Sequence, residues 1–489
     1  MVRIKGGEEK ETRIYYKDDF IEDAEKVLLK QYKIVVDVSF KTGVKLSRRV
    51  AKISDAFGIG VDETHFFKVY DNFALAWNDG DLVFITGDSG GGKSVLLRVI
   101  KRKLSAQGKK IADFSEVKVD ENEVLIESIG RDVNEAMNIF SMVGLNEAFL
   151  VLRKYKELSE GQKYRYRVAK MINSGADVWV MDEFLSMLDR DTAKIVAYCI
   201  QKWARRLGKT VFVATAHKDI IEDFNPNVLV VKNFGSDAET TYLAPTEKEC
   251  SIMREVDIRE GNRSDYNVLK QYHYLPGRLV IKKIFKASYK GEVVGVIVYG
   301  YPVKQLSSRN AVFPEYNNDV QKVFREIIRI MRVIVHPKFR GIGLGQRLVR
   351  ETMRMVSYRI VEVLAVMARY NPFFEKAGMI RVEKKRLNPE FEKLALWLEN
   401  HGFNLDYKGS RRACTAFFKK LNSYRRKVFK RLIKNVMKRR AFLFSGKREE
   451  RRLLEKKWGL EEVIDAMKKL PKDAVYYYWL NPEWVEKSG

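Results

Sequence analysis

The sequence predicts an α/β chain with three parts. These are an α/β domain around a phosphate-binding loop, an α+β domain with a second glycine-rich loop, and a basic helical C-terminal segment. Three observations predict this arrangement. The motif GDSGGGKS stands between an apolar strand pattern and a helical pattern, a second strand pattern runs into the glycines of RGIGLG, and positive charge gathers after residue 418. At 489 residues the chain is longer than a single hydrophobic core supports.

The first element is the strand–loop–helix unit around residues 87–94. The apolar run 82–85 precedes the loop and a helical pattern follows it. Glycines let successive backbone N–H groups point into one concavity, and the helix N-terminus adds positive potential, so the unit suits a phosphate group. Lys93 would reach the terminal phosphates and the Ser94 hydroxyl would ligate Mg²⁺. The other loop residues expected to hold the nucleotide are Gly87, Ser89, Gly90 and Gly92.

The charge of the chain is unusually positive. It has 91 basic and 64 acidic residues, a net charge of +27. This excess of positive charge predicts a polyanionic partner such as nucleic acid. The alternative is the Lys/Glu-rich surface of a thermophilic protein, but that composition alone would not produce so large a positive excess. The three cysteines lack metal-site spacing, and we find neither a signal peptide nor an apolar run of membrane-spanning length. We therefore expect a cytoplasmic protein.

The chain before the phosphate loop is less informative. Residues 1–60 carry a helical pattern, LSRRVAKISDAFGI, but no motif with recognisable chemistry. Phe67 and Tyr70 lie shortly before the loop. Either ring could stack on an adenine or pack in the core, and the sequence leaves both interpretations open.

Three segments after the loop supply groups that nucleotide hydrolysis needs. LSEGQ, residues 158–162, opens a helical pattern. The buried-strand pattern DVWVMDE ends in Asp182 and Glu183, and a further strand pattern leads to His217. Asp182 suits the magnesium shell, Glu183 can polarise a water, and a histidine can sense the terminal phosphate. Their order and spacing predict a nucleotide-hydrolysing site.

Together these segments resemble the ATP-binding-cassette (ABC) ATPases over residues 61–235. The resemblance implies ATP and Mg²⁺ as ligands, Glu183 as the catalytic base and His217 as a switch residue. It also implies that the helix start at LSEGQ closes over the ATP of a second subunit, and hence an ATP-dependent homodimer. The ATP-contacting residues that the resemblance adds are Ser159, Gly161, Gln162 and Asp189.

Two departures from the family pattern matter. Glu160 replaces a glycine of the signature, and Gln107 is the only glutamine between Lys93 and Ser159, too early to be the magnesium-sensing glutamine. The interval from Lys93 to Ser159 is also short, which suggests a trimmed helical subdomain. In transporter cassettes this subdomain engages the permease. We therefore expect a mechanical or switching ATPase with no permease.

A second domain is expected after a linker at residues 236–255. Strand patterns at 279–287 and 292–301 flank the turn 289–291, which predicts an antiparallel hairpin. Residues 327–335 form another strand pattern and lead into HPKFRGIGLGQ. The glycine spacing is not GxGxxG, which disfavours a dinucleotide fold.

RGIGLG, residues 340–345, resembles the acyl-CoA loop of the GNAT (Gcn5-related) N-acetyltransferases, and NPFFEKAGM, residues 371–379, resembles a second motif of that family. The resemblance covers residues 256–420 and implies acetyl-CoA as cofactor. Phe374 stands where a tyrosine general acid is common. The residues that the resemblance places along acetyl-CoA are Val333, Val335, Arg340, Gly341, Gly343, Gly345 and Asn371.

The acceptor side is expected in DYNVLKQYHYLPGR, residues 265–278. His273 would be a suitable general base because its ordinary pKa lies near neutral pH. Tyr272, Tyr274 and Arg278 could stack on a base or clamp a phosphate. The alternative is a loop packed through its aromatic rings. This stretch is also similar to the phage Mom-type DNA modification enzymes.

The positive charge is concentrated in residues 419–457, which hold 17 basic and 3 acidic residues. Apolar residues recur there at helical spacing, which predicts an amphipathic helix with one docked face. Such a helix suits a phosphate backbone, although a membrane-surface helix shares the pattern. The aromatic-rich AVYYYWLNPEW is expected to pack back on the domain. The candidate nucleic-acid contacts are Arg425, Arg426, Lys430, Arg431, Lys434, Arg439 and Arg440.

These parts predict an ATP-dependent acetyltransferase that modifies nucleic acid, above all a base amine of RNA such as tRNA. The fusion resembles an archaeal type. A Mom-type DNA-modifying enzyme, an ATP-gated protein acetyltransferase and a non-catalytic ATP- and CoA-sensing regulator stay open as alternatives. The expected divisions of the chain are an extension at 1–60, the ATPase at 61–235, the linker at 236–255, the acetyltransferase at 256–420 and the basic segment at 421–489.

Overall fold

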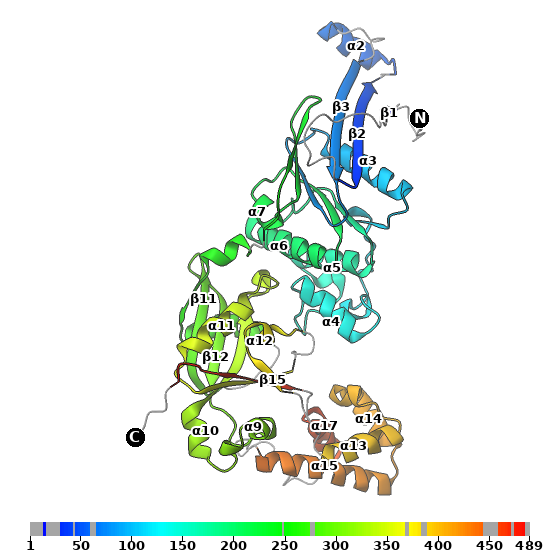
Figure 1. The fold of residues 1–489 in the computed structure, drawn as a ribbon. Helices are drawn as coiled ribbons and strands as arrows, with labels where there is room; N and C mark the ends of the chain where they lie inside the picture. Colours follow the sequence, from blue (N-terminus) through cyan, green and yellow to red (C-terminus); the bar gives the residue numbers. More distant parts are fainter. Residues whose placement is uncertain are drawn as a thin grey trace. The chain divides into compact units, whose positions relative to one another are not determined.

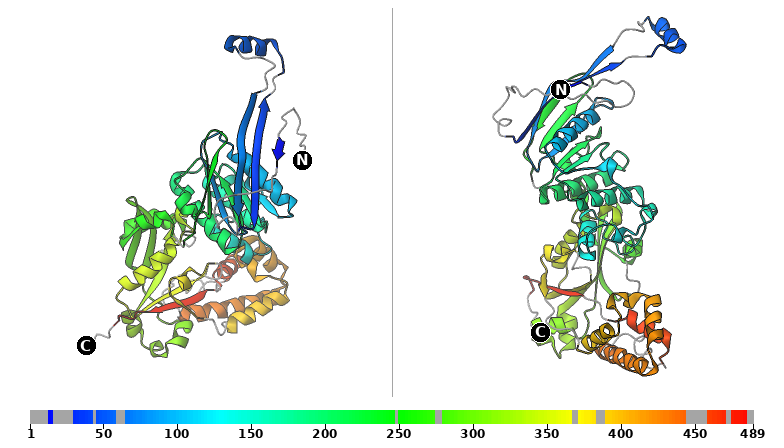
Figure 2. Two further views of the ribbon diagram at one scale, coloured as in Figure 1. Left: turned by 45° about the horizontal axis from the view of Figure 1, so that its top comes forward. Right: turned by 90° about the vertical axis from the view of Figure 1, so that its right-hand side faces the viewer.

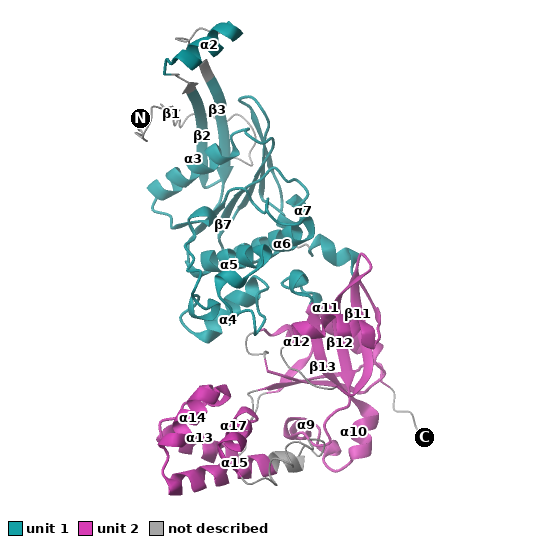
Figure 3. Ribbon diagram, turned by 180° about the vertical axis from the view of Figure 1, so that it is seen from behind, with its two compact units in different colours: residues 1–256, 336–344 teal, residues 257–335, 345–489 magenta. Residues whose placement is uncertain are grey.

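The computed structural model describes residues 13–15, 30–42, 45–58, 65–246, 249–273, 279–366, 371–382, 389–443, 458–470 and 474–484. The chain divides into two compact units. Unit 1 comprises residues 1–256 together with 336–344, and unit 2 comprises residues 257–335 and 345–489 (Figure 3). A short segment of the expected acetyltransferase part therefore belongs to the same unit as the phosphate loop.

The centre of unit 1 is a six-stranded sheet with the strand order β5-β6-β7-β4-β8-β9. Its strands are coloured light blue to green in Figure 1. The first five strands in this order pair in parallel, and β9 is antiparallel to β8. Buried strands of this kind read as apolar runs rather than alternating ones, as β4, β6 and β7 do. The strands are β4 (Leu82–Thr86), β5 (Ile111–Asp113), β6 (Val178–Met181), β7 (Thr210–Ala214), β8 (Val228–Lys232) and β9 (Ala238–Tyr242).

Helices flank this sheet, and two of them show how a local capping residue starts a helix. α5 starts after Ser159 and α6 after Asp189, and each of these side chains accepts a hydrogen bond from a backbone N–H of its own first turn. The helices of unit 1 are α2 (Arg48–Phe57), α3 (Lys93–Ala106), α4 (Val133–Met142), α5 (Glu160–Asn173), α6 (Arg190–Arg206) and α7 (Ile221–Phe224). Its 3-10 turns are η1 (Phe114–Glu116), η2 (Leu125–Glu127), η3 (Tyr155–Glu157), η4 (Ser251–Glu255) and η7 (Pro337–Phe339).

A second sheet of unit 1 holds the N-terminal part of the chain. β1 (Arg13–Tyr15), β2 (Tyr32–Thr42) and β3 (His65–Trp77) are antiparallel in that order. β2 and β3 form a long hairpin with α2 at its far end (Figure 2). Buried residues of β2 and β3 share one hydrophobic core with β4 and α3. The first 60 residues thus contribute core to the domain that carries the phosphate loop.

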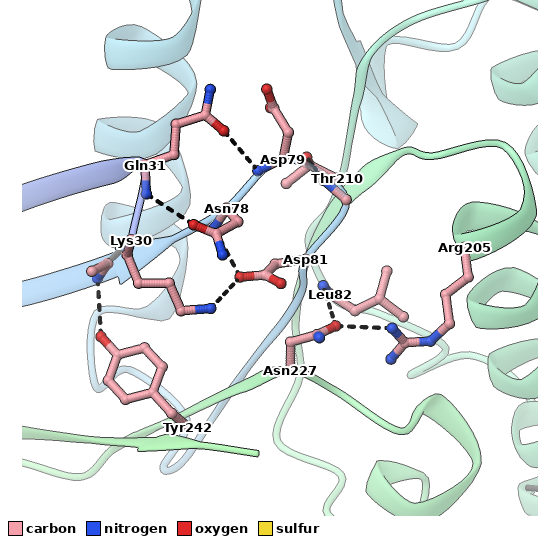
Figure 4. Close-up of polar contacts among 12 residues, drawn as sticks. Lys30, Gln31, Asn78, Asp79, Asp81, Leu82, Arg205, Thr210, Asn227 and Tyr242 are labelled. Carbon is pink, nitrogen blue, oxygen red and sulfur yellow. Dashed lines mark hydrogen bonds and ion pairs between the residues drawn. The ribbon is translucent and has the colours of Figure 1, made fainter. Parts of the chain in front are cut away.

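A polar network fixes the start of β4 (Figure 4). Asp81 accepts hydrogen bonds from Lys30 Nζ at 2.9 Å and from the Asn78 backbone N–H at 2.8 Å. The Leu82 N–H donates to Asn227 Oδ1 at 3.0 Å, and that oxygen also accepts from Arg205 at 3.1 Å. Buried backbone donors need such partners. These bonds hold β4 at the end of the strand opposite to the phosphate loop.

Unit 2 is built on a seven-stranded sheet with the order β10-β11-β12-β13-β14-β16-β15. The predicted hairpin and the predicted strand 327–335 are both present, with the hairpin turn at Lys290 and Gly291 in the left-handed region. β13 and β14 are the parallel pair. The strands are β10 (Asp257–Glu260), β11 (Ile281–Tyr289), β12 (Glu292–Gly300), β13 (Ile327–Val335), β14 (Ile360–Ala365), β15 (Ile380–Val382) and β16 (Val475–Leu480).

Short helices connect these strands, and a helical group separates the last two. The described helices of residues 389–443 and 460–468 form that group, which is inserted in the chain between β15 and β16, and they share a core of their own. The terminal aromatic segment returns as β16 between β14 and β15. The helices of unit 2 are α8 (Arg263–Leu269), α9 (Ser307–Val312), α10 (Val320–Glu326), α11 (Leu344–Met355), α12 (Phe373–Lys376), α13 (Pro389–Asn400), α14 (Arg411–Lys420), α15 (Ser423–Leu443) and α17 (Leu460–Lys468), with the 3-10 turns η5 (Lys270–Tyr272), η6 (Pro314–Tyr316) and η9 (Leu405–Gly409).

Within the described ranges, no helix combines the length and the apolar composition needed to cross a bilayer.

Candidate functional sites

The phosphate loop has the backbone that its sequence predicts. Gly87, Gly90 and Gly92 have φ angles of 129°, 79° and 104°, in the region that favours glycine. Lys93 is 9% exposed, and its ammonium donates to the carbonyls of Gly87 at 3.0 Å and Asp88 at 2.6 Å. The cation therefore lies against the loop that would surround a phosphate.

Two buried side chains, Tyr70 and Lys232, lie next to the phosphate loop. The Tyr70 hydroxyl donates to the Gly92 carbonyl at 3.2 Å, and Tyr70 is 0% exposed. Lys232 is also buried, and its ammonium lies 5.3 Å from the centre of the Tyr70 ring. A Cβ at Gly87 would come within 1.8 Å of the Lys232 carbonyl oxygen. Tyr70 thus packs in the core, whereas Phe67 is 53% exposed.

The predicted hydrolytic residues meet at one edge of the sheet. β6, β7 and β4 are neighbouring parallel strands, so their carboxyl ends share an edge, where the loop, His217 and the two carboxylates follow their strands. Glu183 is exposed with a φ of 48°, a backbone strain common at functional sites. Its N–H donates to Asp182 at 2.9 Å, and the His217 N–H donates to Thr215 at 3.2 Å.

The signature segment forms a capping box at the start of α5. The Gln162 N–H donates to Ser159 Oγ at 3.4 Å, and the Ser159 N–H donates to Gln162 Oε1 at 3.1 Å. Both side chains serve their own helix, and Ser159 is exposed. Gly161 is half-buried in the first turn. The helix N-terminus is therefore available to an anion from solvent.

The site departs from the family pattern at the magnesium-sensing glutamine, for which the sequence offers only Gln107. Gln107 ends α3, before β5 begins. Ser115 and Glu116 follow β5 at the carboxyl edge of the sheet, next to β6. Lys101 pairs with Glu116 at 2.8 Å and with Asp113. Burial opposes ionisation of Asp113, but the hydrogen bonds from Lys101 and Ser115 lower its pKa overall.

The residues at this edge fit a nucleotide with Mg²⁺. The three glycines with positive φ shape the loop backbone around the Lys93 ammonium, as a phosphate-binding loop requires. Across the described residues, no three His, Cys, Asp or Glu side chains form a metal cluster. Mg²⁺ in such sites takes one or two protein ligands and completes its shell with phosphate oxygens and water. Ser94 and Asp182 would hold it in that way.

The predicted acetyl-CoA residues are divided between the two units. Arg340, Gly341 and Gly343 belong to the part of unit 1 at residues 336–344. The φ angles of Gly341 and Gly343 are 94° and 98°, so both positions need glycine. The Arg340 guanidinium pairs with Glu147 at 2.9 Å, and both side chains are largely buried. The Arg340 side chain is therefore engaged in an ion pair within unit 1.

The remaining acetyl-CoA residues lie in unit 2. β13 pairs with β14 only from Ile327 to Arg329, so Val333 and Val335 lie beyond the parallel pairing. A Cβ at Gly345, in the first turn of α11, would contact Val335 at 3.6 Å and Val333 at 4.0 Å. A strand that leads into a glycine-started helix fits an extended, phosphate-bearing cofactor such as acetyl-CoA. Asn371 lies just before α12.

Phe374 is buried, and its ring packs on Phe373, at 4.1 Å between centres, and on Tyr477 of β16, at 5.7 Å. The Tyr477 hydroxyl donates to Glu375 at 2.9 Å. Burial, with the Glu375 carboxylate, raises the pKa of Tyr477 to about 12. Sequence reasoning missed this phenol because β16 lies about a hundred residues after the motif it packs on.

The candidate base contacts the same strand. The Arg332 guanidinium hydrogen-bonds the His273 ring, with Nη1 to Nε2 at 3.0 Å and a shorter contact to Nδ1. A guanidinium only donates, so this contact uses the ring of His273 as the acceptor. Arg332 precedes Val333 on β13, which places His273 beside the predicted cofactor strand. Tyr274 and Arg278 lie outside the described residues, and Tyr272 is half-buried.

Comparisons with known proteins agree with these geometries. Residues 70–186 match the family model described as ABC transporter, and residues 250–379 match the acetyltransferase (GNAT) family. The chain carries an ABC transporter ATPase domain followed by a GNAT acetyltransferase domain. The fold class and both resemblances predicted from the sequence are thereby confirmed.

The curated relatives match the ATPase domain. A methionine import ATP-binding protein MetN of Clostridium tetani is 26% identical over 250 residues, which cover 45% of this chain and 75% of that protein. MetN of Streptococcus pyogenes serotype M12 is 26% identical over 193 residues, covering 32% of this chain and 54% of the relative. The chain thus spans about half the length of this latter relative.

Solved structures give the same kind of match. A dimeric bacterial ABC transporter cassette aligns with a TM-score of 0.31 and 17% identity, over 37% of this chain and 94% of that one. The cbiO1 protein of Clostridium perfringens, part of an ABC transporter complex, aligns with a TM-score of 0.31 and 17% identity, over 36% and 82% of the two chains.

The basic residues within the acetyltransferase sheet's insertion fall into two groups. On α15, Arg426 donates to the carbonyls of Phe418 and Lys419, Lys430 donates to the Trp458 carbonyl, and Lys434 lies 5.2 Å from the Trp458 ring centre. These three side chains hold the helical group together. Side chains of Arg439 and Arg440 lie outside the described residues. The exposed basic residues on α15 include Arg425, Lys427, Arg431 and Lys438.

Proposed function

We propose that the protein is an ATP-dependent acetyltransferase that transfers the acetyl group of acetyl-CoA to an amine of nucleic acid, most simply a base amine of RNA. One observation supports this combination above the others. The helices α13, α14, α15 and α17, of which α15 is the basic helix, lie in the chain between β15 and β16, two neighbouring strands of the acetyltransferase sheet. The two ends of the group are thus tethered beside each other in the sheet that would bind acetyl-CoA.

The ATPase part of the proposal rests on the edge that gathers Lys93, Glu183 and His217. Glu183 would take a proton from the attacking water, and Ser94 and Asp182 would hold Mg²⁺. The N-terminus of α5 is exposed at Ser159 and supports an ATP sandwich, because a helix N-terminus can bind the phosphates of a nucleotide held by a second subunit. We therefore propose an ATP-dependent homodimer.

The transferase part rests on β13 and on the glycines that follow it. The acceptor amine would attack the thioester carbonyl, forming a C–N bond as the C–S bond breaks. His273, which lies beside β13, would act as the general base and take the amine proton. The departing CoA thiolate would take a proton from water, since Phe374 cannot supply one.

The nucleic-acid part rests on the exposed face of α15. Lys427, Arg431 and Lys438 recur at helical spacing and are exposed, while Phe429, Ile433, Val436 and Met437 on the other face are at most 1% exposed. A row of cations on a helix docked through its apolar face suits a phosphate backbone, and its affinity falls steeply with salt.

Incubation with labelled acetyl-CoA tests the proposal. Purified protein would receive ATP or no nucleotide and, in parallel, total tRNA, duplex DNA or a protein extract. We expect label in tRNA, dependent on ATP, and a loss of that label in the triple variant Lys427→Glu, Arg431→Glu, Lys438→Glu. The matched control is Lys393→Glu, an exposed cation of α13 that pairs with Glu390. Label confined to DNA or to protein would contradict the RNA target.

A second candidate function is a non-catalytic sensor of ATP and acetyl-CoA that binds nucleic acid. Phe374 favours it, because the common tyrosine acid is absent from that position. Under this alternative, calorimetry detects acetyl-CoA binding while no fraction acquires label. The same experiment therefore separates the two functions.

A further inference from the structure

The segment at residues 336–344 is part of the ATPase unit and is firmly packed there. Phe339 and Ile342 are each 5% exposed, and Leu344 is 1% exposed. A Cβ at Gly341 would come within 2.7 Å of the Cys199 sulfur on α6. This segment contains two of the glycines that acetyl-CoA is proposed to contact, so its position bears on the acetyltransferase.

The first link to the ATP site is Arg165 on α5. This side chain is 4% exposed, and it donates to the carbonyls of Lys338 at 2.7 Å and Arg340 at 3.3 Å. It also donates to Val143 at 3.3 Å. A buried guanidinium whose N–H groups bond backbone carbonyls holds those carbonyls in place. A shift of α5 would therefore move the segment with it.

The second link is an ion-pair cluster. Lys338 Nζ lies 2.7 Å from Asp189 Oδ1 and 3.3 Å from Asp191 Oδ2. Asp189 is the N-cap of α6, and its carboxylate also accepts from Thr192 at 2.6 Å and 3.1 Å. The loop that ends at Asp189 begins at Asp182 and Glu183, which follow β6 directly. Lys338 therefore contacts the same loop that carries the proposed hydrolytic residues.

Both links come from elements that face ATP. The N-terminus of α5 is the proposed contact with the nucleotide of the second subunit, and Arg165 lies in the second turn of that helix. The 182–189 loop is the proposed contact with Mg²⁺ and the attacking water. Two rigid connections from two ATP-facing elements thus end on one glycine segment.

We infer that the 336–344 segment couples the two sites, so that the ATP-bound state of the ATPase domain sets the affinity for acetyl-CoA, with Lys338 as the positioning residue. The inference rests on the proposed function, because it takes Gly341 and Gly343 as acetyl-CoA contacts. Because the two links tie the segment to α5 and to the 182–189 loop, closure of these elements on ATP would move Gly341 and Gly343 into the position that acetyl-CoA contacts, so that this rearrangement is made before acetyl-CoA binds.

The expected effect has a sign and a size. ATP tightens acetyl-CoA binding at least fivefold, the lower end of ordinary allosteric couplings. Linkage requires acetyl-CoA to tighten ATP binding by the same factor. A residue needed only for folding would not change this ratio of dissociation constants.

Calorimetry on the full chain measures the coupling. The Glu183→Gln variant, which holds ATP without turnover, would be titrated with acetyl-CoA in the presence and absence of ATP and Mg²⁺. The same pair of titrations would follow with Lys338→Met added, with Lys338→Arg added and with Asp191→Asn added. We expect the ratio of affinities to fall below twofold for Lys338→Met, to be largely restored by Lys338→Arg and to be intermediate for Asp191→Asn.

The matched control is Lys209→Met. Lys209 is a partly exposed lysine of unit 1 that lies 3.9 Å from Asp177, at the strand starts opposite to the ATP edge. Its replacement should leave the ratio unchanged. Thermal denaturation of every variant shows whether each is folded.

Three results would overturn the inference. If ATP leaves the acetyl-CoA affinity unchanged or weakens it, the coupling does not exist in the stated direction. If the ratio persists in Lys338→Met, the coupling does not pass through the Asp189 cluster. A chain that binds no acetyl-CoA in any state would overturn the proposed acetyltransferase function as well, so the two failures are distinguishable.

Discussion

The two glycine loops of this chain use the same backbone chemistry but are supported in different ways. The phosphate loop at residues 87–92 joins a strand and a helix that are adjacent in sequence, and Lys93 bonds the carbonyls of its own loop. The 336–344 segment also has two glycines with positive φ, but its side-chain partners, Glu147, Arg165 and Asp189, come from far earlier in the chain. A local sequence motif therefore predicts the backbone conformation of a glycine loop. Contacts with residues distant in the sequence determine which part of the protein holds that loop in place.

The largest effect should come from the chemistry beside the first loop. Glu183→Gln removes the proposed base and keeps nearly the same shape. Because a positioned base contributes about 10²–10⁴-fold, we expect the rate of ATP hydrolysis to fall by that factor while ATP binding persists. Steady-state phosphate release and nucleotide calorimetry check this. Gel filtration with ATP should show a trapped dimer, and a variant that stays monomeric would contradict the ATP sandwich.

The second effect concerns what holds the 336–344 segment. Arg165→Met fills a similar volume but removes the donors to the carbonyls of Val143, Lys338 and Arg340. Since each buried acceptor left unsatisfied costs about 1 kcal/mol or more, we expect a loss of about 3 kcal/mol in the free energy of unfolding of unit 1. Urea unfolding followed by tryptophan fluorescence measures it. Unchanged stability would mean that the free-energy cost of burying the guanidinium equals the stabilisation from its hydrogen bonds.

Sequence reasoning reached the elements with strong local signals. Strands β4, β6, β7, β11, β12 and β13 were predicted because apolar runs and a Lys-Gly turn mark them. It did not reach β16 as the strand between β14 and β15, nor the Arg340–Glu147 pair, because neither leaves a local trace. Helical periodicity predicted which face of α15 is buried, but not that Arg426, Lys430 and Lys434 bond neighbouring backbone and rings.

The third effect separates two glycines of the same segment. Gly341 and Gly343 share a positive φ, but a Cβ at Gly341 meets the Cys199 sulfur at 2.7 Å, whereas a Cβ at Gly343 meets nothing within 4 Å. An alanine at either position is strained by about 1 kcal/mol. Gly341→Ala adds a steric clash, so we expect a total loss of about 2 kcal/mol, against about 1 kcal/mol for Gly343→Ala.

Thermal denaturation of the two alanine variants gives this difference directly. A double variant, Gly341→Ala with Cys199→Ala, serves as the control, because it frees the space at the sulfur and should return part of the stability lost. If the two single variants lose equal stability, the packing of the segment against α6 contributes nothing beyond its backbone conformation.

The smallest effect concerns pH and the Lys338 ion pair. Burial opposes ionisation of Asp189, but hydrogen bonds from Lys338 and Thr192 outweigh it and lower its pKa; burial likewise opposes the charge of Lys338, but its carboxylate partners raise its pKa. A carboxyl whose pKa is lower in the folded chain contributes its full stability at a pH above its pKa in the unfolded chain, about 3.9. That contribution is lost as the pH falls through its pKa in the folded chain. A raised lysine pKa gives stability that is full below about 10.4 and is lost above the folded value.

The pair should therefore stabilise unit 1 between about pH 4 and pH 10, by no more than about 1 kcal/mol because Asp189 is 60% exposed. Urea unfolding of the wild-type chain and of Lys338→Met across this range measures the contribution as a difference, so that the other carboxylates cancel. The difference should be constant near neutral pH and shrink below pH 4, and added salt should reduce it. A difference that persists at pH 3 would mean that Lys338 acts through its aliphatic stem, and the segment would then be held by packing, by Arg165 and by the Arg340–Glu147 pair.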